Sequence, residues 1–458
     1  MHVVPFLLLG LLLTGCSTQA PEARPADPPD RYEQAATYSA THAGDALVVW
    51  ERGEVVLERG QNGFALDTPH MLASGTKTFA GIAALAAQAD GLFSLDERVS
   101  TTIREWKDDP RRSEITVRQL LHLTSGLDPG ASGQAPTFDA ALDAAVLDAP
   151  GTTFRYGPVP FQAFGALLRR ALDGEDPVPY YRRRILAPIG VTNDQWAYVD
   201  GQDPQLAGGA RLTAREWLRV GRLLLNDGRW NGTRVLPPGA LDTLAQPTEA
   251  SPGYGYTVWL NAPIDTSHAF FDHAPPSLQP DGPDGMIYHA GPNDLVMAAG
   301  LFNQRLYVVP SREMVAVRFG RPDASWNDAE FLARLLDGRS YEAPARKRRP
   351  IEERVALLTT LRMTQLDRAL RLTEAQETAL RPHVERRLRA WAAFQQSTEP
   401  SGALNRRERR RLFRRLRTVH RETNRAIEAE LTPGQVKTYH DIQAERRDRW
   451  RSPEGRER

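Results

Sequence analysis

Hydrophobic and polar positions divide the chain into two stretches of different character. Near the amino end, ALVVW at 46–50 and VVLERG at 55–60 flank a turn at Gly53, which predicts an antiparallel hairpin. Helical patterns follow at 74–89, 115–127, 161–172 and 213–226, strand patterns at 254–260, 305–309 and 313–319, and a closing helix at 327–337. Strands at both ends of a mainly helical middle indicate an α+β domain over about residues 40–341, with an antiparallel sheet that joins the two ends.

The second stretch shows no strand pattern. The polar segment EAPARKRRP at 342–350 predicts a linker, and helical segments follow at roughly 352–370, 374–396, 404–430 and 433–450. Thr373-Glu374-Ala375-Gln376 and Thr432-Pro433-Gly434-Gln435 each fit a capping box, in which Thr caps the helix and Gln reaches back. We expect an all-α hairpin or small bundle at residues 351–450.

Charge supports this division. The formal net charge of the whole chain is only +1. Residues 1–345 hold 29 Lys and Arg against 41 Asp and Glu, a net −12, whereas residues 346–458 hold 29 against 16, a net +13. An acidic domain is therefore followed by a basic helical one.

The amino terminus predicts export. Residues 3–13 are apolar but too short for a permanent membrane span, and they lead into Leu13-Thr14-Gly15-Cys16. This run resembles the lipobox of bacterial lipoproteins, which implies a signal peptide at 1–15, lipidation of Cys16 and a tether at 16–39. The resemblance implies a lipoprotein that faces the periplasm, with Ser17 favouring the outer membrane. The alternative is an ordinary signal peptide in which the cysteine occurs by chance. Because Cys16 is the only cysteine of the sequence, an internal disulfide framework is excluded.

The strongest candidate for chemistry is Ser74-Gly75-Thr76-Lys77, at the start of the helix predicted for 74–89. Residues three apart in a first helical turn share a face, so the Lys77 amine can reach the Ser74 hydroxyl. A lysine can act as a base only if its pKa falls toward neutrality, and both burial and the helix dipole act in that direction. The chain has only four lysines among 58 basic residues, and arginine cannot be deprotonated, which favours a proton-accepting role for Lys77. The alternative is that Ser74 is only a helix cap.

Three segments resemble the serine β-lactamase-related family. They are LASGTKTFAGIAALAAQADGLFSLDERV at 72–99, ITVRQLLHLTSGL at 115–127 and APGTTFRYG at 149–157, and similarity continues at 207–232 and 298–320. That family includes class C β-lactamases, DD-peptidases, EstB-type esterases and 6-aminohexanoate-dimer hydrolases. The resemblance implies a β-lactamase/transpeptidase-like fold, with Ser74 as nucleophile, Lys77 as its base and Tyr156 as the proton relay to the leaving group. A cation beside Tyr156 would be expected to lower the pKa of its phenol.

Two departures from the family pattern bear on the substrate. The second motif is Tyr156-Gly157-Pro158 and lacks the amide of the usual Tyr-x-Asn. The basic third motif is replaced by Ala298-Ala299-Gly300, which makes Ala299 and Gly300 candidate substrate-binding residues, while His289-Ala290-Gly291 is an off-register candidate. Without a cation for a β-lactam carboxylate, we expect an esterase, amidase or DD-peptidase-like serine hydrolase for a small-molecule or peptide substrate, rather than an efficient β-lactamase. The alternative is a non-catalytic envelope scaffold that retains this fold.

Other classes of function find little support. The chain has no His-Glu-x-x-His, phosphate loop or dinucleotide fingerprint, so we expect no metal and no cofactor. Leu372-Thr373-Glu374-Ala375-Gln376 and Leu431-Thr432-Pro433-Gly434-Gln435 resemble the LTxxQ motif of the periplasmic Spy and CpxP group of helical proteins. The arginine-rich segment 406–417 is typical of a solvated helix face, with contact to anionic lipid or envelope proteins as the alternative. Export makes nucleic acid an unsuitable partner.

Overall fold

The computed structural model describes residues 30–131, 133–264, 268–273, 284–323, 325–341, 351–397 and 406–440. The predicted signal peptide, Cys16, the linker at 342–350 and the end of the last predicted helix lie outside these ranges. Within the described residues, no helix is both long and apolar enough to span a membrane.

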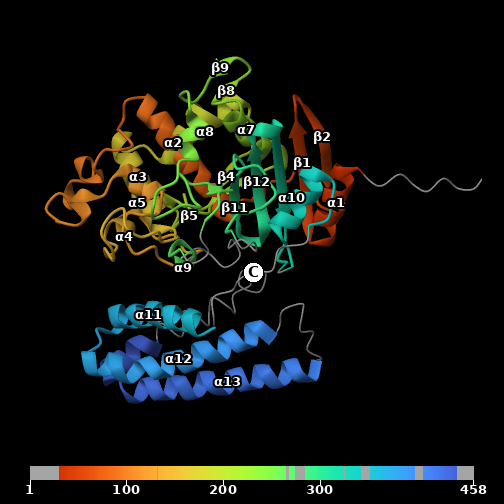
Figure 1. Ribbon diagram of the computed structural model, residues 1–458. Coiled ribbons are helices and arrows are strands. Elements are labelled where there is room, and N and C mark those ends of the chain that lie inside the picture. The colour runs from red at the N-terminus through yellow and green to blue at the C-terminus, as the bar shows by residue number, and fades with distance from the viewer. Residues whose placement is uncertain are drawn as a thin grey trace, which may run out of the picture.

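A six-stranded antiparallel sheet organises the first domain (Figure 1). Its order is β10-β11-β12-β13-β1-β2, so the amino-terminal hairpin pairs with the last strands of the domain and joins both ends of the segment, as predicted. The apolar run in β1 is buried along its whole length because β1 lies between β2 and β13, whereas the charged β2 forms an edge. The strands are β1 Gly44–Glu51, β2 Glu54–Gly60, β10 Trp259–Leu260, β11 Val296–Gly300, β12 Gln304–Val309 and β13 Met314–Gly320.

Helices cover both faces of this sheet. Helix α7 approaches so closely that a Cβ on Gly221 would lie 2.5 Å from Val315 Cγ1 and 2.7 Å from Leu306 Cδ1. Since side chains alternate along a strand, Arg305 points to the other face, where it meets Asp328 at the start of α10. Helices α1 and α10 lie side by side on that face (Figure 1). Their bounds are α1 Arg31–Thr41, α7 Ala214–Leu225 and α10 Asp328–Asp337.

A helical subdomain and several short strands complete the domain. The helices are α2 Lys77–Ala89, α3 Val117–Leu121, α4 Phe138–Leu142, α5 Val159–Ala171, α6 Pro177–Tyr181, α8 Ala240–Leu244 and α9 Phe270–His273. The short strands are β3 His70–Met71, β4 Gln195–Trp196, β5 Tyr198–Val199, β6 Asp203–Pro204, β7 Ala210–Leu212, β8 Arg229–Trp230 and β9 Thr233–Arg234. The α+β, β-lactamase/transpeptidase-like fold predicted from the sequence is confirmed.

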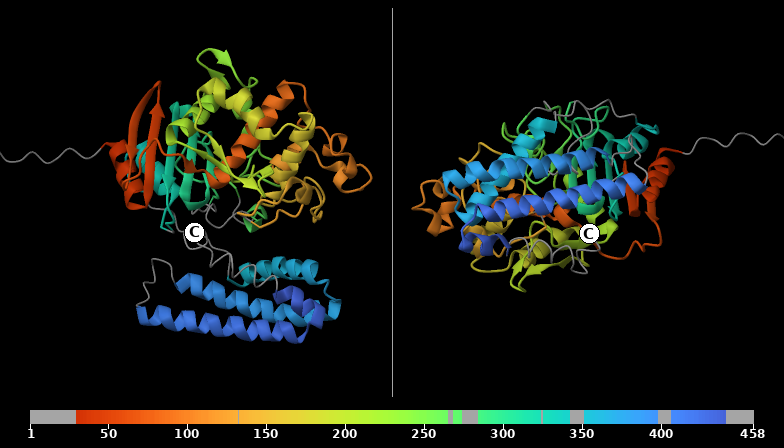
Figure 2. Two further views of the ribbon diagram at one scale, coloured as in Figure 1. Left: turned by 180° about the vertical axis from the view of Figure 1, so that it is seen from behind. Right: turned by 90° about the horizontal axis from the view of Figure 1, so that it is seen from below.

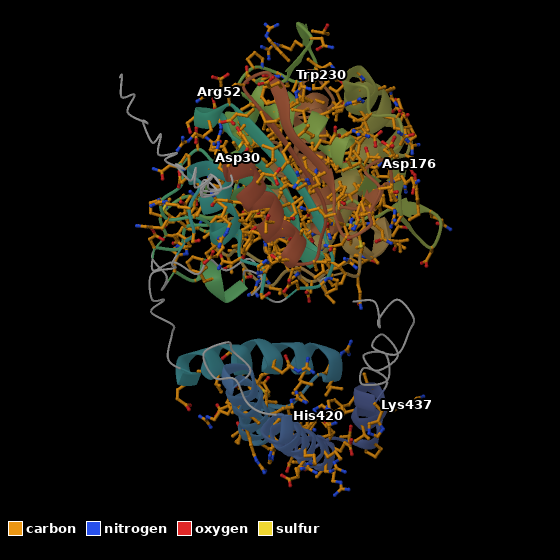
Figure 3. The ribbon with its side chains drawn as sticks, turned by 90° about the vertical axis from the view of Figure 1, so that its right-hand side faces the viewer. Asp30, Arg52, Asp176, Trp230, His420 and Lys437 are labelled. Carbon is orange, nitrogen blue, oxygen red and sulfur yellow. The ribbon has the colours of Figure 1, made fainter. Side chains whose placement is uncertain are left out.

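Helix α1 corrects the predicted tether. The tether was expected to extend through residue 39, but Asp30, labelled in Figure 3, caps a helix that begins at Arg31. Ala35, Ala36 and Tyr38 are buried in the core of the domain. The proline-rich composition before residue 30 concealed this short amphipathic pattern, which belongs to the folded domain.

Two other elements differ from the expected ones. Only Trp259–Leu260 of the strand predicted for 254–260 pairs with β11, because Thr257 adopts a left-handed φ of 66° that extended structure does not allow. The helix predicted for 115–127 ends at Leu121, since Leu123 has a φ of 60°. The chain then enters a loop that pairs with the segment before Tyr156, which follows α4.

The carboxy-terminal helices are α11 Ile351–Leu370, α12 Glu374–Ser397 and α13 Arg406–Ala429, and residues 433–440 are also helical (Figure 2). Both predicted capping boxes form: Thr373 N–H and Thr432 N–H donate to the side chains of Gln376 and Gln435 at 3.0 and 2.9 Å. The two glutamines also contact each other, with Gln376 Nε2 2.9 Å from Gln435 Oε1 and Gln435 Nε2 3.2 Å from Gln376 Oε1. The repeated motifs therefore join two helix starts that lie 59 residues apart.

Candidate active site

Ser74 lies in a tight 3₁₀ turn, Ala73–Thr76, immediately before α2. The turn is held by the Gly75 N–H, which donates to Leu72 O at 3.0 Å, and it begins with Ala73 at a left-handed φ of 46°. Gly75 is required here because a Cβ would lie 2.7 Å from Trp217 Cζ2. Ala73, Gly75 and Thr76 are buried while Ser74 is partly exposed, so the turn presents the serine hydroxyl.

The Lys77 amine lies next to that hydroxyl. Its Nζ is 3.1 Å from Ser74 Oγ, a contact that the spacing of the two residues predicted. The same Nζ donates to Ala207 O at 2.9 Å. Lys77 is only 4% exposed. Burial lowers the pKa of the amine to about 7, so that a large fraction is neutral and able to accept a proton at neutral pH.

Tyr156 reaches the same place through paired loops. Gly151 N–H donates to Thr124 O at 2.7 Å and Arg155 N–H donates to Leu123 O at 2.8 Å, which ties the loop before Tyr156 to the segment after α3. Gly126 allows this approach, since a Cβ there would lie 2.2 Å from Asp148 O. The structure thus brings all three predicted catalytic residues together, with Lys77 Nζ 4.8 Å from the centre of the Tyr156 ring.

The pKa of Tyr156 contradicts the expectation from the sequence. A neighbouring cation was expected to lower it, but burial raises the pKa of the phenol to about 12, only partly opposed by Ser74 and by the charge of Arg305. Desolvation of the buried phenol outweighs both of these opposing effects. Tyr156 is therefore protonated at neutral pH.

Pro158 stands where the family motif has its amide. Gly157 packs against the carbonyl of Pro129, where a Cβ would lie 2.1 Å from the oxygen, and Pro158 caps α5. The second partner of Lys77 is the carbonyl of Ala207. Sequence analysis did not identify Ala207, because a backbone acceptor has no residue signature, although Ala207 begins the segment 207–232 that resembles the family.

The end of β11 lies against the Ser74 turn. A Cβ on Gly300 would lie 2.0 Å from Leu72 O, so only glycine permits this contact. Ala299 and Gly300 are buried at this strand end. The structure thus places these two candidates at the turn, whereas His289 is exposed on a loop and pairs with Asp284.

Aromatic side chains surround Tyr156. Its ring lies 5.7 Å from Trp259 and 6.3 Å from Tyr254, and Phe154 joins the group at 5.5 Å from Tyr254. Among the described residues, no cluster of His, Cys, Asp or Glu is suited to hold a metal ion. The chemistry that this arrangement can perform is nucleophilic attack by Ser74, with Lys77 as base and Tyr156 as acid.

Comparisons with known proteins show which proteins this chain resembles. A 30%-identical segment of 169 residues matches lovastatin esterase of Penicillium rubens, covering 30% of this chain and 42% of the relative. A 32%-identical segment of 158 residues matches monacolin J acid methylbutanoyltransferase of Aspergillus terreus, covering 28% of this chain and 38% of the relative. The chain thus matches less than half the length of these curated relatives.

Solved structures share the fold. A penicillin-binding protein homolog from Caulobacter crescentus superimposes with a TM-score of 0.52 at 16% identity, covering 67% of this chain and 96% of the other. A family VIII carboxylesterase gives a TM-score of 0.51 at 15% identity, covering 67% and 98%. The family model described as Beta-lactamase matches residues 30–333, which is most of the chain. The protein therefore belongs to the beta-lactamase family.

Proposed function

We propose that this protein is a serine hydrolase that cleaves carboxylic esters through an acyl-enzyme on Ser74. The observation that carries the proposal is the Lys77 amine, 3.1 Å from Ser74 Oγ, with a pKa that burial lowers to about 7. Such an amine can take the serine proton as Oγ attacks the substrate carbonyl. The Gly75 N–H is used to hold the turn, so we propose the Ser74 N–H as a donor to the oxyanion that develops.

The raised pKa of Tyr156 suits it to the second proton transfer. A phenol that stays protonated at neutral pH can give its proton to the departing alkoxide, which is a stronger base than a phenolate. The resulting phenolate is then reprotonated by the Lys77 ammonium, which holds the proton taken from Ser74. Water hydrolyses the acyl-enzyme with Lys77 again as the base. The Lys77 ammonium then returns that proton to Ser74 Oγ as the serine leaves the acyl group, which regenerates the serine hydroxyl and the neutral amine.

Esters are favoured over β-lactams by the charges near the turn. The strand end at 298–300 carries no cation, and Arg305 on the neighbouring strand is buried and bound to Asp328 by two contacts of 2.8 and 3.0 Å. A substrate carboxylate therefore finds no ready partner there, which favours a substrate without that charge. The similarity to a lovastatin esterase supports the same choice.

Labelling of the serine tests this proposal. We expect a fluorophosphonate probe to label the wild-type protein and not Ser74→Ala, and short-chain aryl esters to be hydrolysed faster than a chromogenic cephalosporin or D-amino-acid amides. Folded wild-type protein that reacts with none of these compounds would exclude the hydrolase and leave the non-catalytic scaffold. Rapid cephalosporin turnover would instead exclude the preference for esters.

The envelope location is part of the proposal. Cys16 would be acylated after removal of residues 1–15, holding the protein on the periplasmic side of the membrane. Metabolic labelling with a fatty-acid analogue tests this: we expect Cys16→Ser to lose the label and leave the membrane fraction. An unlabelled wild-type protein would contradict the anchor.

The carboxy-terminal helices are proposed to resemble the Spy and CpxP group. The mutual contact of Gln376 and Gln435 supports this, because it gives the two repeated motifs a joint structural role. Suppression of aggregation of an unfolded client, compared between the full chain and a variant that ends at residue 341, tests for chaperone activity. Equal suppression by both would argue against it.

A further inference from the structure

Arg305 on β12 is a buried charge that is hydrogen-bonded through all three of its nitrogens. It is 1% exposed, and its Nε and Nη2 reach the two carboxylate oxygens of Asp328 at 2.8 and 3.0 Å. The same carboxylate also accepts from the Tyr307 hydroxyl and from Trp326 Nε1, the latter at 3.1 Å. Burying such a pair contributes little stability compared with apolar residues of similar volume, so its presence calls for another explanation.

The third donor of Arg305 points toward the candidate site. Nη1 donates to Gly300 O at 3.0 Å and to Gln304 O at 3.1 Å, across the turn between β11 and β12. Gly300 in turn packs on the backbone of Leu72, where a Cβ would lie 2.0 Å from the carbonyl oxygen. Leu72 O is the acceptor that closes the Ser74 turn. A continuous series of contacts thus runs from Asp328 through Arg305, Gly300 and Leu72 to the serine.

We propose that Arg305 is a positioning residue, which with Asp328 holds the end of β11 against the Ser74 turn. An apolar pair could fill the same volume, but it could not hold the Gly300 carbonyl. The charge of Arg305 also acts on Tyr156, where it opposes the effect of burial on the phenol pKa. The kinetic part of this inference rests on the proposed hydrolase function, and its structural part does not.

Hydrogen exchange tests the structural part without any substrate. Arg305→Lys keeps the charge beside Asp328 but cannot serve both that carboxylate and Gly300 O. We expect faster amide exchange in peptides that cover residues 71–77 and 298–303, with unchanged exchange in β1 and β2. Tyr307→Phe is the matched control, because it removes another donor to Asp328 and leaves the contact with Gly300 in place.

A triple variant separates positioning from stability. Arg305→Met with Asp328→Leu replaces the ion pair by apolar groups, and Tyr307→Phe removes the buried hydroxyl that would otherwise lose its acceptor, a replacement that is often neutral or stabilising. We expect this variant to fold, yet to hydrolyse 4-nitrophenyl butyrate with a kcat about 10- to 100-fold below wild type and a KM within about two-fold. Tyr307→Phe should keep kcat within about two-fold of wild type.

The outcomes are decisive in either direction. Wild-type exchange at 71–77 and 298–303 in both Arg305 variants would overturn the inference, even if the protein proved to have no hydrolase activity. Faster amide exchange at these peptides together with a wild-type kcat would overturn the inference that Arg305 affects catalysis. Failure of the wild-type protein to react at Ser74 would instead refute the proposed function and leave the exchange result to judge the contacts.

Discussion

The most informative prediction concerns the proton on Lys77. Burial lowers the pKa of its amine from 10.5 to about 7. At about 1.4 kcal/mol for each pKa unit, holding this amine in its charged form in the native protein costs about 5 kcal/mol. That is a large share of the unfolding free energy of a typical domain, so the effect is measurable.

The sign of the pH dependence follows from linkage. Between pH 7 and pH 10.5 the unfolded chain binds the Lys77 proton and the native protein does not, so this residue makes the unfolding free energy rise with pH. Lys77→Met removes the penalty. We therefore expect the variant to be more stable than wild type by about 5 kcal/mol at pH 6 and by about 2 kcal/mol at pH 9, each reduced by about 1 kcal/mol for the lost contact with Ala207 O.

Two measurements check this prediction. Urea unfolding at pH 6 and pH 9 gives the stability difference, provided that the slope with denaturant is unchanged. Nuclear magnetic resonance of protein labelled at lysine Cε resolves four side chains, and the signal absent from Lys77→Met identifies the residue. In activity assays, kcat/KM should fall as the pH drops through about 7. A Lys77 signal that titrates near 10, or a stability difference that does not depend on pH, would refute the reasoning.

Three further predictions concern other parts of the molecule. Gly300→Ala should reduce fluorophosphonate labelling of Ser74 by at least about ten-fold, because the new Cβ would lie 2.0 Å from Leu72 O. Gly208→Ala is the control and should be tolerated, since its Cβ would lie 3.9 Å from Ala73. An equal loss of labelling in both variants would contradict the steric argument. Tyr156→Phe should lower kcat about 10²- to 10⁴-fold for ethyl esters. The loss should be smaller for 4-nitrophenyl esters, because their leaving group needs no acid. An equal loss for both ester series would argue against Tyr156 as the acid. In thermal unfolding of the full chain followed at 222 nm, Gln376→Ala and Gln435→Ala should each destabilise the carboxy-terminal helices by about 1 kcal/mol. The double variant should lose less than the sum, and strict additivity would show that the two side chains do not cooperate.

Sequence patterns predicted most of the fold because long amphipathic segments and paired strands leave a clear period. The hairpin β1–β2, helices α5, α7 and α10, and both capping boxes of the carboxy-terminal helices lie close to their expected positions. Helix α1 was missed because residues 17–36 are rich in proline, alanine and charge, and its buried face is set by packing on the sheet. Thr257 was predicted to lie in a strand because β-branched residues favour extended structure. Its left-handed backbone is unusual for such a residue and is imposed by the surrounding fold, which the sequence pattern does not reveal.

The residues of the candidate site also fall into those that the sequence predicted and those that it did not. Ser74 and Lys77 were found because a helical turn fixes their separation, and Tyr156 was found through family resemblance. Ala207 contributes only a carbonyl, and Arg305 acts from the far face of the sheet, so neither leaves a motif along the chain. The direction of the Tyr156 pKa shift depends on how far burial outweighs neighbouring charge, which only the folded protein determines.

The pairing of β1 with β13 has a consequence for biosynthesis. During translation, the Ser74 turn and α2 emerge long before residues 314–320, yet the strand that closes the sheet beside β1 comes from that late segment. Contacts so distant in sequence form slowly, because the intervening chain must first be ordered. The nascent chain therefore carries its reactive serine without the strand edge at Gly300 until β11, Val296–Gly300, has been made. A ribosome-bound or truncated chain that lacks β11 to β13 should be unable to react with substrate, which would keep unfinished copies of the protein catalytically silent.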